Sequence, residues 1–387
     1  MRVLYVIDAL GEGGTESSLA DLLLPLADRG VESTIAILKS RGEEGVEQSL
    51  RRRGVDVRVL PPGRLLAQVR ALRSLSREVR PDLVHSMLFA SDLRARVVRA
   101  RGGPPLVNSV VNTSYVSERL VNPELSARKL AAVRLVDKAT ARWVDRFHAV
   151  SRPVAEHTAS SLGVPSSMIT VIERGRDDGP LGERSEERRT TARQALALTD
   201  DSFVIANLAR HEHQKGIDTL LRATARITGE LDVVVVQAGR DGRATTELRT
   251  LHAALQLGDR FRFLGHRKDV GDILAAADVF AFPSRYEGMP GAVIEALALA
   301  LPVVASDIAT VTSILDVNEN ALVFPVDDAE ALADRCRQLS LDSARRTAMG
   351  RRSRALFDER FTMDRSADAM AQLYDTVVAH ARPGAAG

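Results

Sequence analysis

The chain has few of the features that mark secreted, membrane-spanning or metal-cluster proteins. Its 387 residues include one cysteine, Cys336, which excludes a disulfide framework and a multi-cysteine zinc site. No apolar run is long enough to span a membrane. The first run, in "MRVLYVIDALGEGG", is short and carries Asp8, so we interpret it as a strand and not a signal peptide. The net charge of +2 does not indicate a nucleic acid or another strongly acidic partner. We therefore expect a cytoplasmic globular protein.

A regular alternation of short β-branched runs with helical stretches fills the chain. It begins with "RVLYVID" and "TESSLADLLLPLADRG", continues to "RFHAVS", and restarts at "SFVIANLA" after the polar break "RGRDDGPLGERSEERRTTARQAL". This pattern is typical of parallel sheets covered by helices on both faces. Because 387 residues exceed one ordinary core, we predict two doubly wound domains, 1–180 and 181–360. We expect the polar break to be part of the hinge, and residues 361–387 to form a last helix and tail.

Three glycines separate the first strand from the first helix. Gly11, Gly13 and Gly14 let the backbone approach a ligand, and the helix N-terminus offers amides to an anion. A nicotinamide-binding fingerprint fits poorly, because its third glycine would be Glu16 and the second strand ends in Lys39 instead of an acid. The alternative interpretation is a tight turn without a ligand.

Two cations follow the first strand of the second half, in "NLARHEHQKGIDTLL". Arg210 and Lys215 lie between that strand and the next helix, a position that suits a pyrophosphate. Lysine is rare in this arginine-rich chain, so its presence at 215 indicates a need for a compact point charge. The alternative is a solvated pair of loop charges. His211 and His213 share the loop, but no third ligand is near in sequence, so we predict no metal site.

The stretch "PSRYEGMPGAVIEALALALPVVAS" places two acids around a helix start. Glu295 lies inside an apolar helix, where an unpaired carboxylate costs on the order of several kcal/mol. Glu287 precedes the turn that opens this helix, whose first amides face the strand end. A diphosphate held by these amides and the two cations would leave Glu287 and Glu295 to bind hydroxyls on either side of it. The alternative for Glu295 is a buried acid paired with a structural arginine.

The Glu-x7-Glu spacing of "EGMPGAVIE" resembles the motif of the retaining family 4 glycosyltransferases, and the resemblance extends over nearly the whole chain. "ARHEHQKGIDTLLRA" is similar to the family's phosphate-binding segment, "FRFLGHRKDV" to the stretch that meets the nucleobase, and "GEGGTESSLADLL" to the loop that faces the donor. The resemblance implies a GT-B fold, in which two Rossmann-like domains, the first acceptor-binding and the second nucleotide-sugar-binding, face a deep cleft. The last helix, about 361–383, would cross back to the first domain.

The resemblance also implies the residues of the site. Glu287, Arg210 and Lys215 would carry catalysis, with Glu295 on the ribose hydroxyls of the nucleotide sugar. The other expected donor contacts are Gly13, Gly14, Gly265, His266, Gly288, Met289, Pro290, Gly291, Ala292 and Val293. The acceptor or sugar side would contain Asn112, Thr113, His85 and Glu16. We expect no required cofactor or metal.

Three departures from the family pattern concern the sugar and the acceptor. Asn112 stands where the family often has a histidine, and an amide cannot act as a base at neutral pH. The usual Gly-Gly after "VVASD" is Ala309-Thr310, followed by Ser313 where an acid is usual, and Ala209 replaces the glycine before Arg210. Sugar identity and acceptor contacts stay open for this reason.

The implied activity is sugar transfer from a nucleotide diphosphate sugar, with a UDP-sugar favoured, to a glycan, lipid-linked or small-molecule hydroxyl. We expect front-face attack with retention, in which the departing phosphate takes the acceptor's proton. The rivals are an epimerase or hydrolase of the nucleotide sugar and a non-catalytic binding protein.

A peripheral contact with the inner face of a membrane is a further alternative, based on "GRLLAQVRALRSLSREVR". Leu65, Val69, Leu72 and Val79 share one helical face, whereas Arg70, Arg73, Arg77 and Arg80 share another. A solvated face above a domain core is the favoured interpretation of this stretch.

Overall fold

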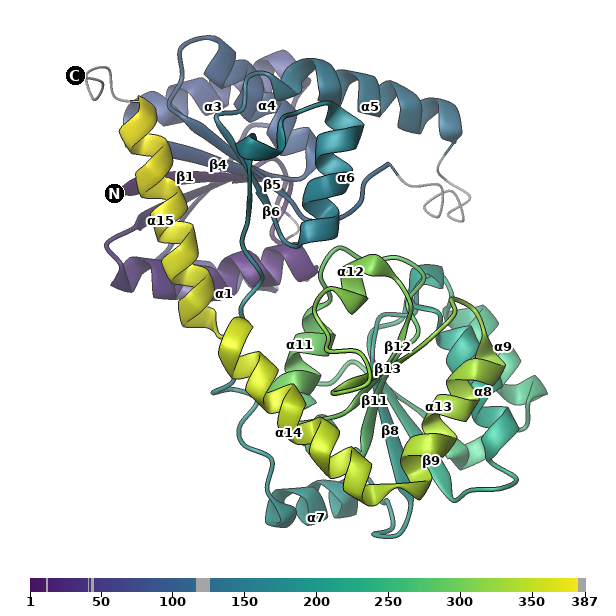
Figure 1. Ribbon diagram of the computed structural model, residues 1–387. Helices are drawn as coiled ribbons and strands as arrows, with labels where there is room; N and C mark the ends of the chain where they lie inside the picture. The colour runs from purple at the N-terminus through teal and green to yellow at the C-terminus, as the bar shows by residue number, and fades with distance from the viewer. Residues whose placement is uncertain (12, 41, 43–44, 116–125, 382–387) are drawn as a thin grey trace. The chain divides into compact units, whose positions relative to one another are not determined.

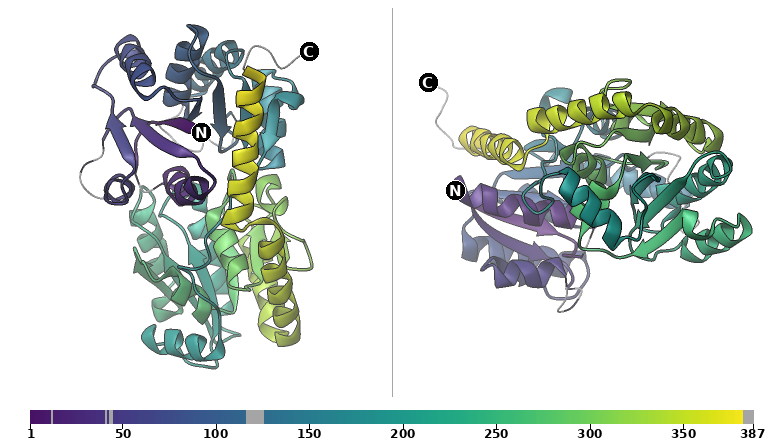
Figure 2. Two further views of the ribbon diagram at one scale, coloured as in Figure 1. Left: turned by 90° about the vertical axis from the view of Figure 1, so that its left-hand side faces the viewer. Right: turned by 90° about the horizontal axis from the view of Figure 1, so that it is seen from below.

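The strand–helix alternation builds two parallel sheets, each with helices on both faces (Figures 1 and 2). The structure is a computed structural model that describes residues 1–387 except 12, 41, 43–44, 116–125 and 382–387. The chain divides into two compact units. Unit 1 is Met1–Gly175 with Met363–Gly387, and unit 2 is Arg176–Thr362. The predicted α/β class with two doubly wound domains is confirmed.

Unit 1 contains a seven-stranded sheet of order β3-β2-β1-β4-β5-β6-β7, in which all neighbouring strands are parallel. Its strands are β1 Arg2–Ile7, β2 Glu32–Ile37, β3 Asp56–Val59, β4 Leu83–Met87, β5 Leu106–Val110, β6 Arg146–Ala149 and β7 Ile169–Val171. Its α-helices are α1 Gly14–Asp28, α2 Val46–Arg52, α3 Leu65–Val79, α4 Phe89–Ala100, α5 Ala127–Ala141, α6 Arg152–Leu162 and α15 Met363–Ala381. A 3-10 turn, η2 Ser166–Met168, precedes β7.

The last helix belongs to unit 1, although the whole of unit 2 precedes it in the chain. α15 packs against α1, and its buried residues join the core on one face of the sheet (Figure 1). Tyr374 on α15 is fully buried there with Tyr5 of β1. On the opposite face, Val69 and Leu72 of α3 are buried in a second core cluster. The apolar face of α3 therefore covers the core, as the favoured interpretation predicted.

Unit 2 contains a six-stranded sheet of order β10-β9-β8-β11-β12-β13, also parallel throughout. Its strands are β8 Phe203–Leu208, β9 Val233–Ala238, β10 Phe261–Gly265, β11 Val279–Phe282, β12 Val303–Ser306 and β13 Ala321–Phe324. Its α-helices are α7 Glu186–Ala195, α8 Ile217–Ile227, α9 Thr245–Ala254, α10 Val270–Ala276, α11 Gly291–Ala298, α12 Ala309–Thr312, α13 Ala329–Leu341 and α14 Ser343–Arg360. The 3-10 turns are η3 His213–Lys215 and η4 Gly258–Arg260.

The segment that we predicted as a polar break is only partly irregular. It contains α7, which begins after the N-cap Ser185 and packs against α10, with an ion pair of 2.8 Å between Arg188 and Asp272. The units themselves divide after Gly175 and after Thr362, near the limits placed at 180 and 360. Part of the predicted tail, 382–387, lies outside the described residues.

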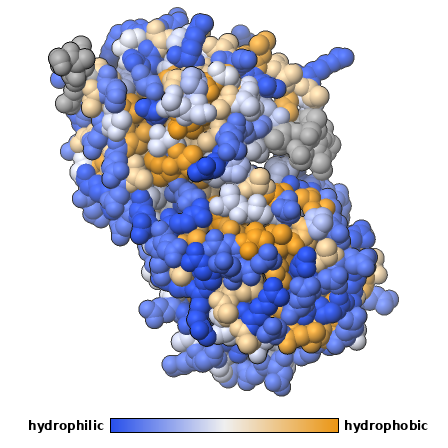
Figure 3. All heavy atoms as spheres, in the orientation of Figure 1, coloured by the Kyte–Doolittle hydropathy of each residue, from blue (hydrophilic) through white to orange (hydrophobic). Residues whose placement is uncertain are grey.

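Few large apolar side chains are exposed, and the face drawn in Figure 3 is mostly hydrophilic with scattered apolar areas. Cys336 of α13 is 1% exposed in the core of unit 2. No helix in the described part of the chain is long and apolar enough to cross a membrane.

Candidate active site

Two loops meet where the strand order of unit 2 reverses. β8 and β11 are neighbours in the sheet although α8, β9, α9, β10 and α10 separate them in sequence. Successive crossovers leave in opposite directions from such a pair, and ligands of doubly wound sheets bind beside the carboxyl ends of these strands. Residues 209–216 follow β8, and residues 283–290 follow β11. The predicted catalytic residues lie in these two loops.

Lys215 and Glu287 form an ion pair across the two loops. The Nζ atom of Lys215 donates to Oε1 of Glu287 at 2.5 Å, and the side chains are 18% and 10% exposed. The ammonium also lies 5.9 Å from the ring centre of Phe282, the last residue of β11. A carboxylate this far from solvent needs a charge partner, and Lys215 supplies it. Each group can still accept or donate further hydrogen bonds to a ligand.

A glycine allows the loops to touch. Gly216 has φ +61°, and a Cβ atom there would lie 2.0 Å from the carbonyl oxygen of Pro283. No other residue type fits both the left-handed conformation and this backbone approach. Gln214 and Arg285 hold the contact, since Gln214 Nε2 donates to Tyr286 O at 2.7 Å and the Arg285 amide donates to Gln214 O at 2.8 Å. The sequence analysis missed both residues.

Glu295 lies in α11, one turn beyond the helix start, and pairs with Arg176. The Nε atom of Arg176 donates to Oε1 of Glu295 at 3.1 Å, with the side chains 11% and 24% exposed. A Cβ atom on Gly291 would lie 1.9 Å from Arg176 NH2, so the guanidinium lies directly against the first turn of α11. The arginine partner envisaged as the alternative for Glu295 is thus present, although the sequence analysis did not identify Arg176.

The residues predicted to contact the donor through α11 form the entrance to that helix. Met289 is 3% exposed, and Pro290 is the N-cap with an extended backbone. Gly291, Ala292 and Val293 form the first turn, and Gly288 precedes them. The first amides of a helix have no acceptor within it, so this turn presents N–H groups beside the carboxyl ends of β8 and β11.

Arg210 lies in the same region but is not held by a carboxylate. It is exposed immediately after β8 and has no ion pair among the residues that the structure describes. Its neighbour Ala209 contacts the next loop closely, because a Cβ atom on Gly239 would lie 1.8 Å from Ala209 O. At the end of β10, Gly265 has φ +68°, and His266 accepts a hydrogen bond of 3.4 Å from Arg240 Nε.

In unit 1, the predicted glycine loop forms the start of α1. Gly13 is the N-cap, Gly14 is the first helical residue, and Glu16 is the acid of the first turn. A Cβ atom on Gly13 would lie 2.4 Å from Oε2 of Glu16, so this carboxylate folds back over the loop. On Gly14, the nearest atom to such a Cβ would be Arg174 NH1, at 3.6 Å. The loop therefore has a carboxylate and a guanidinium close to it.

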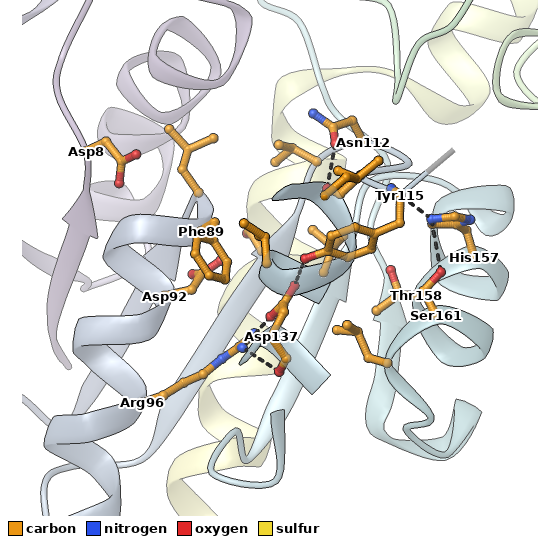
Figure 4. Close-up of a pocket in the computed structure, with 18 residues that line it drawn as sticks. Asp8, Phe89, Asp92, Arg96, Asn112, Tyr115, Asp137, His157, Thr158 and Ser161 are labelled. Carbon is orange, nitrogen blue, oxygen red and sulfur yellow. Dashed lines mark hydrogen bonds and ion pairs between the residues drawn. The ribbon is translucent and has the colours of Figure 1, made fainter. Parts of the chain in front are cut away.

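A cavity of about 310 Å³ lies at the carboxyl ends of β4 and β5 (Figure 4). Asn112, which follows β5, lines it and accepts a hydrogen bond of 2.9 Å from Ser114. Thr113 follows Asn112 and is half-buried. The remaining walls are mixed, with apolar residues and a polar set that comprises Asp8, Asp92, Arg96, Tyr115, Asp137 and His157.

The charges in this cavity are largely satisfied by each other. Arg96, 2% exposed, pairs with Asp137 at 2.5 Å and donates to Asn108 at 2.7 Å, while the Tyr115 hydroxyl donates to the same aspartate. Burial raises the pKa of Asp92 to about 7, against the opposing effects of Arg96 and Ser86. The walls of the cavity are therefore polar, and the positive charge of Arg96 is already paired with Asp137.

His85 is in the core of unit 1 and not at a surface. Its ring, 2% exposed, hydrogen-bonds to the Tyr374 hydroxyl and to Ser109 Oγ, both at 2.7 Å. Ser109 Oγ continues to His148 Nδ1 at 2.7 Å, and His148 Nε2 lies 3.0 Å from the carbonyl of Ile172. Both nitrogens of His85 are thus engaged, and the structure gives this ring a role in joining α15 to the sheet. Its predicted place on the sugar side stays a prediction.

The carbonyl of Ile172 sets the direction of this buried chain of hydrogen bonds. A carbonyl only accepts, so His148 carries a proton on Nε2, and as a neutral ring it accepts from Ser109 through Nδ1. Ser109 then accepts from His85 Nε2, and His85 accepts from Tyr374. The chain requires both rings to be neutral. Burial, reinforced by the other histidine, lowers the pKa of His85 to about 3, and burial lowers that of His148 to about 4.

Within the described ranges, no group of three His, Cys, Asp or Glu side chains could hold a metal ion. The metal independence expected from the sequence stays a prediction.

Comparison with known proteins identifies both halves of the chain. The family model "Glycosyltransferase Family 4" matches residues 12–179, and "Glycosyl transferases group 1" matches residues 188–356. A D-inositol 3-phosphate glycosyltransferase of Xylanimonas cellulosilytica is 30% identical over 305 residues, which cover 76% of this chain and 71% of that protein. The lipopolysaccharide core biosynthesis glycosyltransferase LpsE of Rhizobium meliloti is 25% identical over 370 residues, 94% of this chain and 96% of that one.

Solved structures have the same fold. The structure of Anabaena Alr3699/HepE in complex with UDP matches with a TM-score of 0.84 at 20% identity, over 97% of this chain and 100% of that chain. Sucrose-phosphate synthase from Thermosynechococcus elongatus matches with a TM-score of 0.83 at 22% identity, over 98% and 100%. These structures show the GT-B fold, and the two family models with the relatives show that the chain is a glycosyltransferase and belongs to family 4.

Proposed function

We propose that this glycosyltransferase moves a sugar from a nucleotide diphosphate sugar, with a UDP-sugar favoured, to an acceptor hydroxyl with retention of configuration. The observation that carries the proposal is the Lys215–Glu287 ion pair, which lies beside the first turn of α11 at the switch point of unit 2. It places a cation, an acid and helix amides where a doubly wound sheet binds its ligand.

The donor diphosphate is held by positive groups that are already in place. Lys215 and the amides of the first turn of α11 bind the phosphates, and the exposed Arg210 closes on them from the loop after β8. Glu295 accepts hydrogen bonds from the ribose hydroxyls while its ion pair with Arg176 keeps it oriented. Glu287 accepts from hydroxyls of the transferred sugar while sharing Lys215 with the phosphate. Because both acids are already paired without a ligand, donor binding adds hydrogen bonds to these pairs and does not bury new unpaired charges.

Transfer then depends on stabilising the leaving group. Cleavage of the bond between the anomeric carbon and the phosphate oxygen builds positive charge on the sugar and negative charge on the diphosphate. Lys215, Arg210 and the α11 amides are aimed at that negative charge. The acceptor oxygen attacks the face from which the diphosphate departs, and its proton passes to the departing phosphate oxygen. The new bond therefore has the configuration of the old one, and no protein nucleophile or metal is needed.

The acceptor group enters the cavity of unit 1 at the ends of β4 and β5. Its volume of about 310 Å³ is at the lower end of the range for small-molecule sites, which suits one ring of a glycan or a small polyol. Asn112 and the carboxylates offer hydrogen-bond acceptors to hydroxyls. Relatives act, by their names, on D-inositol 3-phosphate or in lipopolysaccharide core biosynthesis, and the Anabaena protein was solved with UDP-glucose. These likenesses support a nucleotide-sugar donor and a polyhydroxyl acceptor.

The test is a panel of UDP-, GDP- and ADP-sugars, first for thermal stabilisation of the protein and then for transfer to sugar and cyclitol acceptors. We expect one nucleotide sugar to stabilise the wild-type chain and the Lys138→Ala control, in which an exposed lysine of α5 is removed. The Lys215→Ala variant should lose most of this effect. NMR of the product should show the donor's anomeric configuration.

Incubation with the donor alone separates the rival reactions. Rapid formation of free sugar or an epimer, with no acceptor-dependent product, would refute transfer in favour of hydrolysis or epimerisation. An inverted product would refute the front-face mechanism, and unchanged donor binding by Lys215→Ala would refute the assignment of the site.

A further inference from the structure

A second cavity, this one in unit 2, lies at the opposite end of that unit's sheet from the Lys215–Glu287 pair. It is about 370 Å³ in volume and lies by Asp278 and Pro302, which precede β11 and β12. Four arginines line it, namely Arg184, Arg189, Arg346 and Arg351, and we call it the basic pocket. Its lining includes only two acids, Glu186 and Asp278. Ligands of doubly wound sheets bind at the carboxyl ends of strands, so the family's donor chemistry does not account for this pocket.

The acids of the basic pocket do not balance its arginines. Asp278 is already bound by Arg189 at 3.2 Å and by Arg193 at 2.7 Å, and it accepts from the Val204 amide at 2.8 Å. The Glu186 side chain is 92% exposed and lies 4.0 Å from Arg189. Four guanidinium groups against two carboxylates leave an excess positive charge in the lining.

Three of the arginines have no carboxylate partner among the described residues. Arg184 donates to the carbonyls of Ala277 at 2.7 Å and Ala275 at 3.4 Å, which fixes it at the end of α10. Arg346 donates through NH1 to Ser340 O at 2.9 Å and to Leu339 O, which fixes it at the end of α13. Arg351 is exposed on α14. Burial lowers the pKa of Arg184, an effect that the charge of Asp278 opposes and that of Arg189 adds to.

Backbone carbonyls therefore fix these two guanidinium groups in position, and neither group forms an ion pair with a carboxylate of the described residues. The Arg346 guanidinium lies over the Phe203 ring, 5.5 Å from its centre, and uses only NH1 for its carbonyl bonds, so its Nε and NH2 donors can bind an oxyanion. Arginine binds phosphate and carboxylate through paired N–H groups, and such charge-assisted bonds are the strongest that side chains make. The guanidinium groups of the basic pocket come from different segments of the chain. A tetrahedral oxyanion can accept hydrogen bonds from several such directions, whereas a planar carboxylate cannot.

We propose that the basic pocket binds a small phosphorylated metabolite through Arg184, Arg346 and Arg351, separately from the donor site. Its cavity is within the size range of small-ligand sites, so the ligand is a phosphate monoester of a small molecule. The proposal is independent of the transfer reaction and of the identity of its substrates.

Such a ligand would bind where α14 supports α11. A Cβ atom on Gly350 would lie 2.4 Å from Ala300 O, so α14 touches the segment directly after α11 through backbone atoms. Ser353 Oγ donates to Leu301 O at 2.7 Å, and Arg354 donates to Ala298 O at 3.0 Å. Because α11 also carries Glu295, an anion in the basic pocket stabilises the support of the donor helix. We therefore expect it to raise the melting temperature of unit 2.

The experiment measures binding of inorganic phosphate and of a hexose 6-phosphate to the full chain by calorimetry, at constant ionic strength in chloride. A Lys215→Ala background weakens competition by the donor site. We expect saturable binding with one site per chain. The single variant Arg351→Gln and the double variant Arg346→Gln/Arg351→Gln should each weaken this binding at least tenfold. The control removes two exposed arginines of α8, Arg222→Gln with Arg226→Gln, and should bind as the background does.

Arg351→Gln keeps the test decisive if the double variant fails to fold, because Arg351 is exposed and pairs with no carboxylate in the described chain. Equal phosphate binding by the Arg351→Gln variant and the control would overturn the proposal. A calorimetric signal that does not saturate with phosphate, or that titration with chloride also gives, would overturn it as well. Co-sedimentation with phosphatidylglycerol vesicles without saturable binding of the soluble phosphates would overturn the assignment to a small metabolite.

Discussion

The buried His85–Ser109–His148 chain of hydrogen bonds makes unit 1 sensitive to acid. Both rings are neutral in the folded state, with the pKa of His85 at about 3 and that of His148 at about 4. In the unfolded chain a histidine has a pKa of about 6.5. Between these values the unfolded state binds more protons, so the free energy of unfolding decreases as the pH falls from about 6.5. Replacement of both histidines by asparagine should remove this dependence.

The size of the effect follows from the two pKa differences. Between pH 7 and pH 5, each histidine that titrates only in the unfolded state costs about 2 kcal/mol of stability, because one pKa unit corresponds to about 1.4 kcal/mol. Two such groups cost about 4 kcal/mol, a large fraction of the ~5–15 kcal/mol that stabilises a domain. Asp92 acts in the opposite direction, because its pKa is raised to about 7 by burial and its folded form gains a proton over the same range. The difference between variant and wild type isolates the histidines, since Asp92 is common to both.

The only tryptophan gives a probe of the correct unit. Trp143 lies in unit 1 between α5 and β6, so its fluorescence in urea reports the unfolding that involves the histidines. His85→Asn and His148→Asn should each lower stability at pH 7, because buried partners lose hydrogen bonds. Between pH 7 and pH 5, the free energy of unfolding should fall by about 2 kcal/mol less in each single variant than in the wild type. In the double variant it should fall by about 4 kcal/mol less.

His380 provides the matched control for this measurement. It is exposed on α15, and its one hydrogen bond among the described residues is to the carbonyl of Thr376, at 2.7 Å. His380→Asn should keep the wild-type pH dependence. If the variants at 85 and 148 also kept it, the two rings would not be neutral in the folded state, and the direction assigned to the hydrogen-bond chain would be incorrect.

Four further changes test the site and the packing around it. Lys215→Ala should reduce turnover by roughly 10² or more in a product assay, since it removes charge aimed at the leaving diphosphate; a near-normal rate would contradict the assignment. Glu295→Gln should raise the KM for the donor about tenfold with kcat changed less, because ribose binding is weakened equally in ground and transition states; the reverse pattern would place Glu295 in the chemical step. Gly239→Ala should cost about 1–3 kcal/mol in urea unfolding followed by circular dichroism, because the new Cβ would lie 1.8 Å from Ala209 O; an unchanged midpoint would refute this close approach. Tyr374→Phe should cost about 1–3 kcal/mol by Trp143 fluorescence, since a buried acceptor loses its donor, and an unchanged midpoint would mean that α15 is not held by this bond.

Most strands could be predicted from sequence because parallel sheets bury both faces of each strand. Runs such as "DVVVVQAG" and "VFAFPS" are apolar without interruption, and both form strands of unit 2. The elements that were missed lack such a signal. α14 is rich in arginine and has few apolar positions; besides the buried Met349, Leu356 and Phe357, backbone contacts and hydrogen bonds to the segment 298–301 hold it. α7 was hidden in a charged stretch for the same reason.

The site shows a similar division between local and long-range information. The spacing of Glu287 and Glu295 is visible in one segment, and Lys215 is conspicuous because lysine is rare. Arg176 could not be identified as a partner of Glu295, because 119 residues separate the two and only the folded sheet brings them together. His85 illustrates the converse. Its position in the sequence does not show that Tyr374, from a helix 289 residues away, covers its ring in the core of unit 1.

Arg176 connects the donor-side acid to the segments by which the chain enters and leaves unit 2. It is the first residue of that unit, its amide donates to Phe361 O at 2.8 Å, and it forms a β-bridge with Thr362, the last residue of the unit. The same residue's guanidinium binds Glu295 and lies against Gly291 at the start of α11. A displacement of either connecting segment would therefore act on the position of a carboxylate in the candidate site through a single side chain. Pulling apart a largely buried ion pair is costly, because each charge is then left without its partner. The pair with Arg176 therefore favours a single position of the Glu295 side chain. It also explains how an acid can be accommodated inside the apolar helix α11, which the local sequence does not.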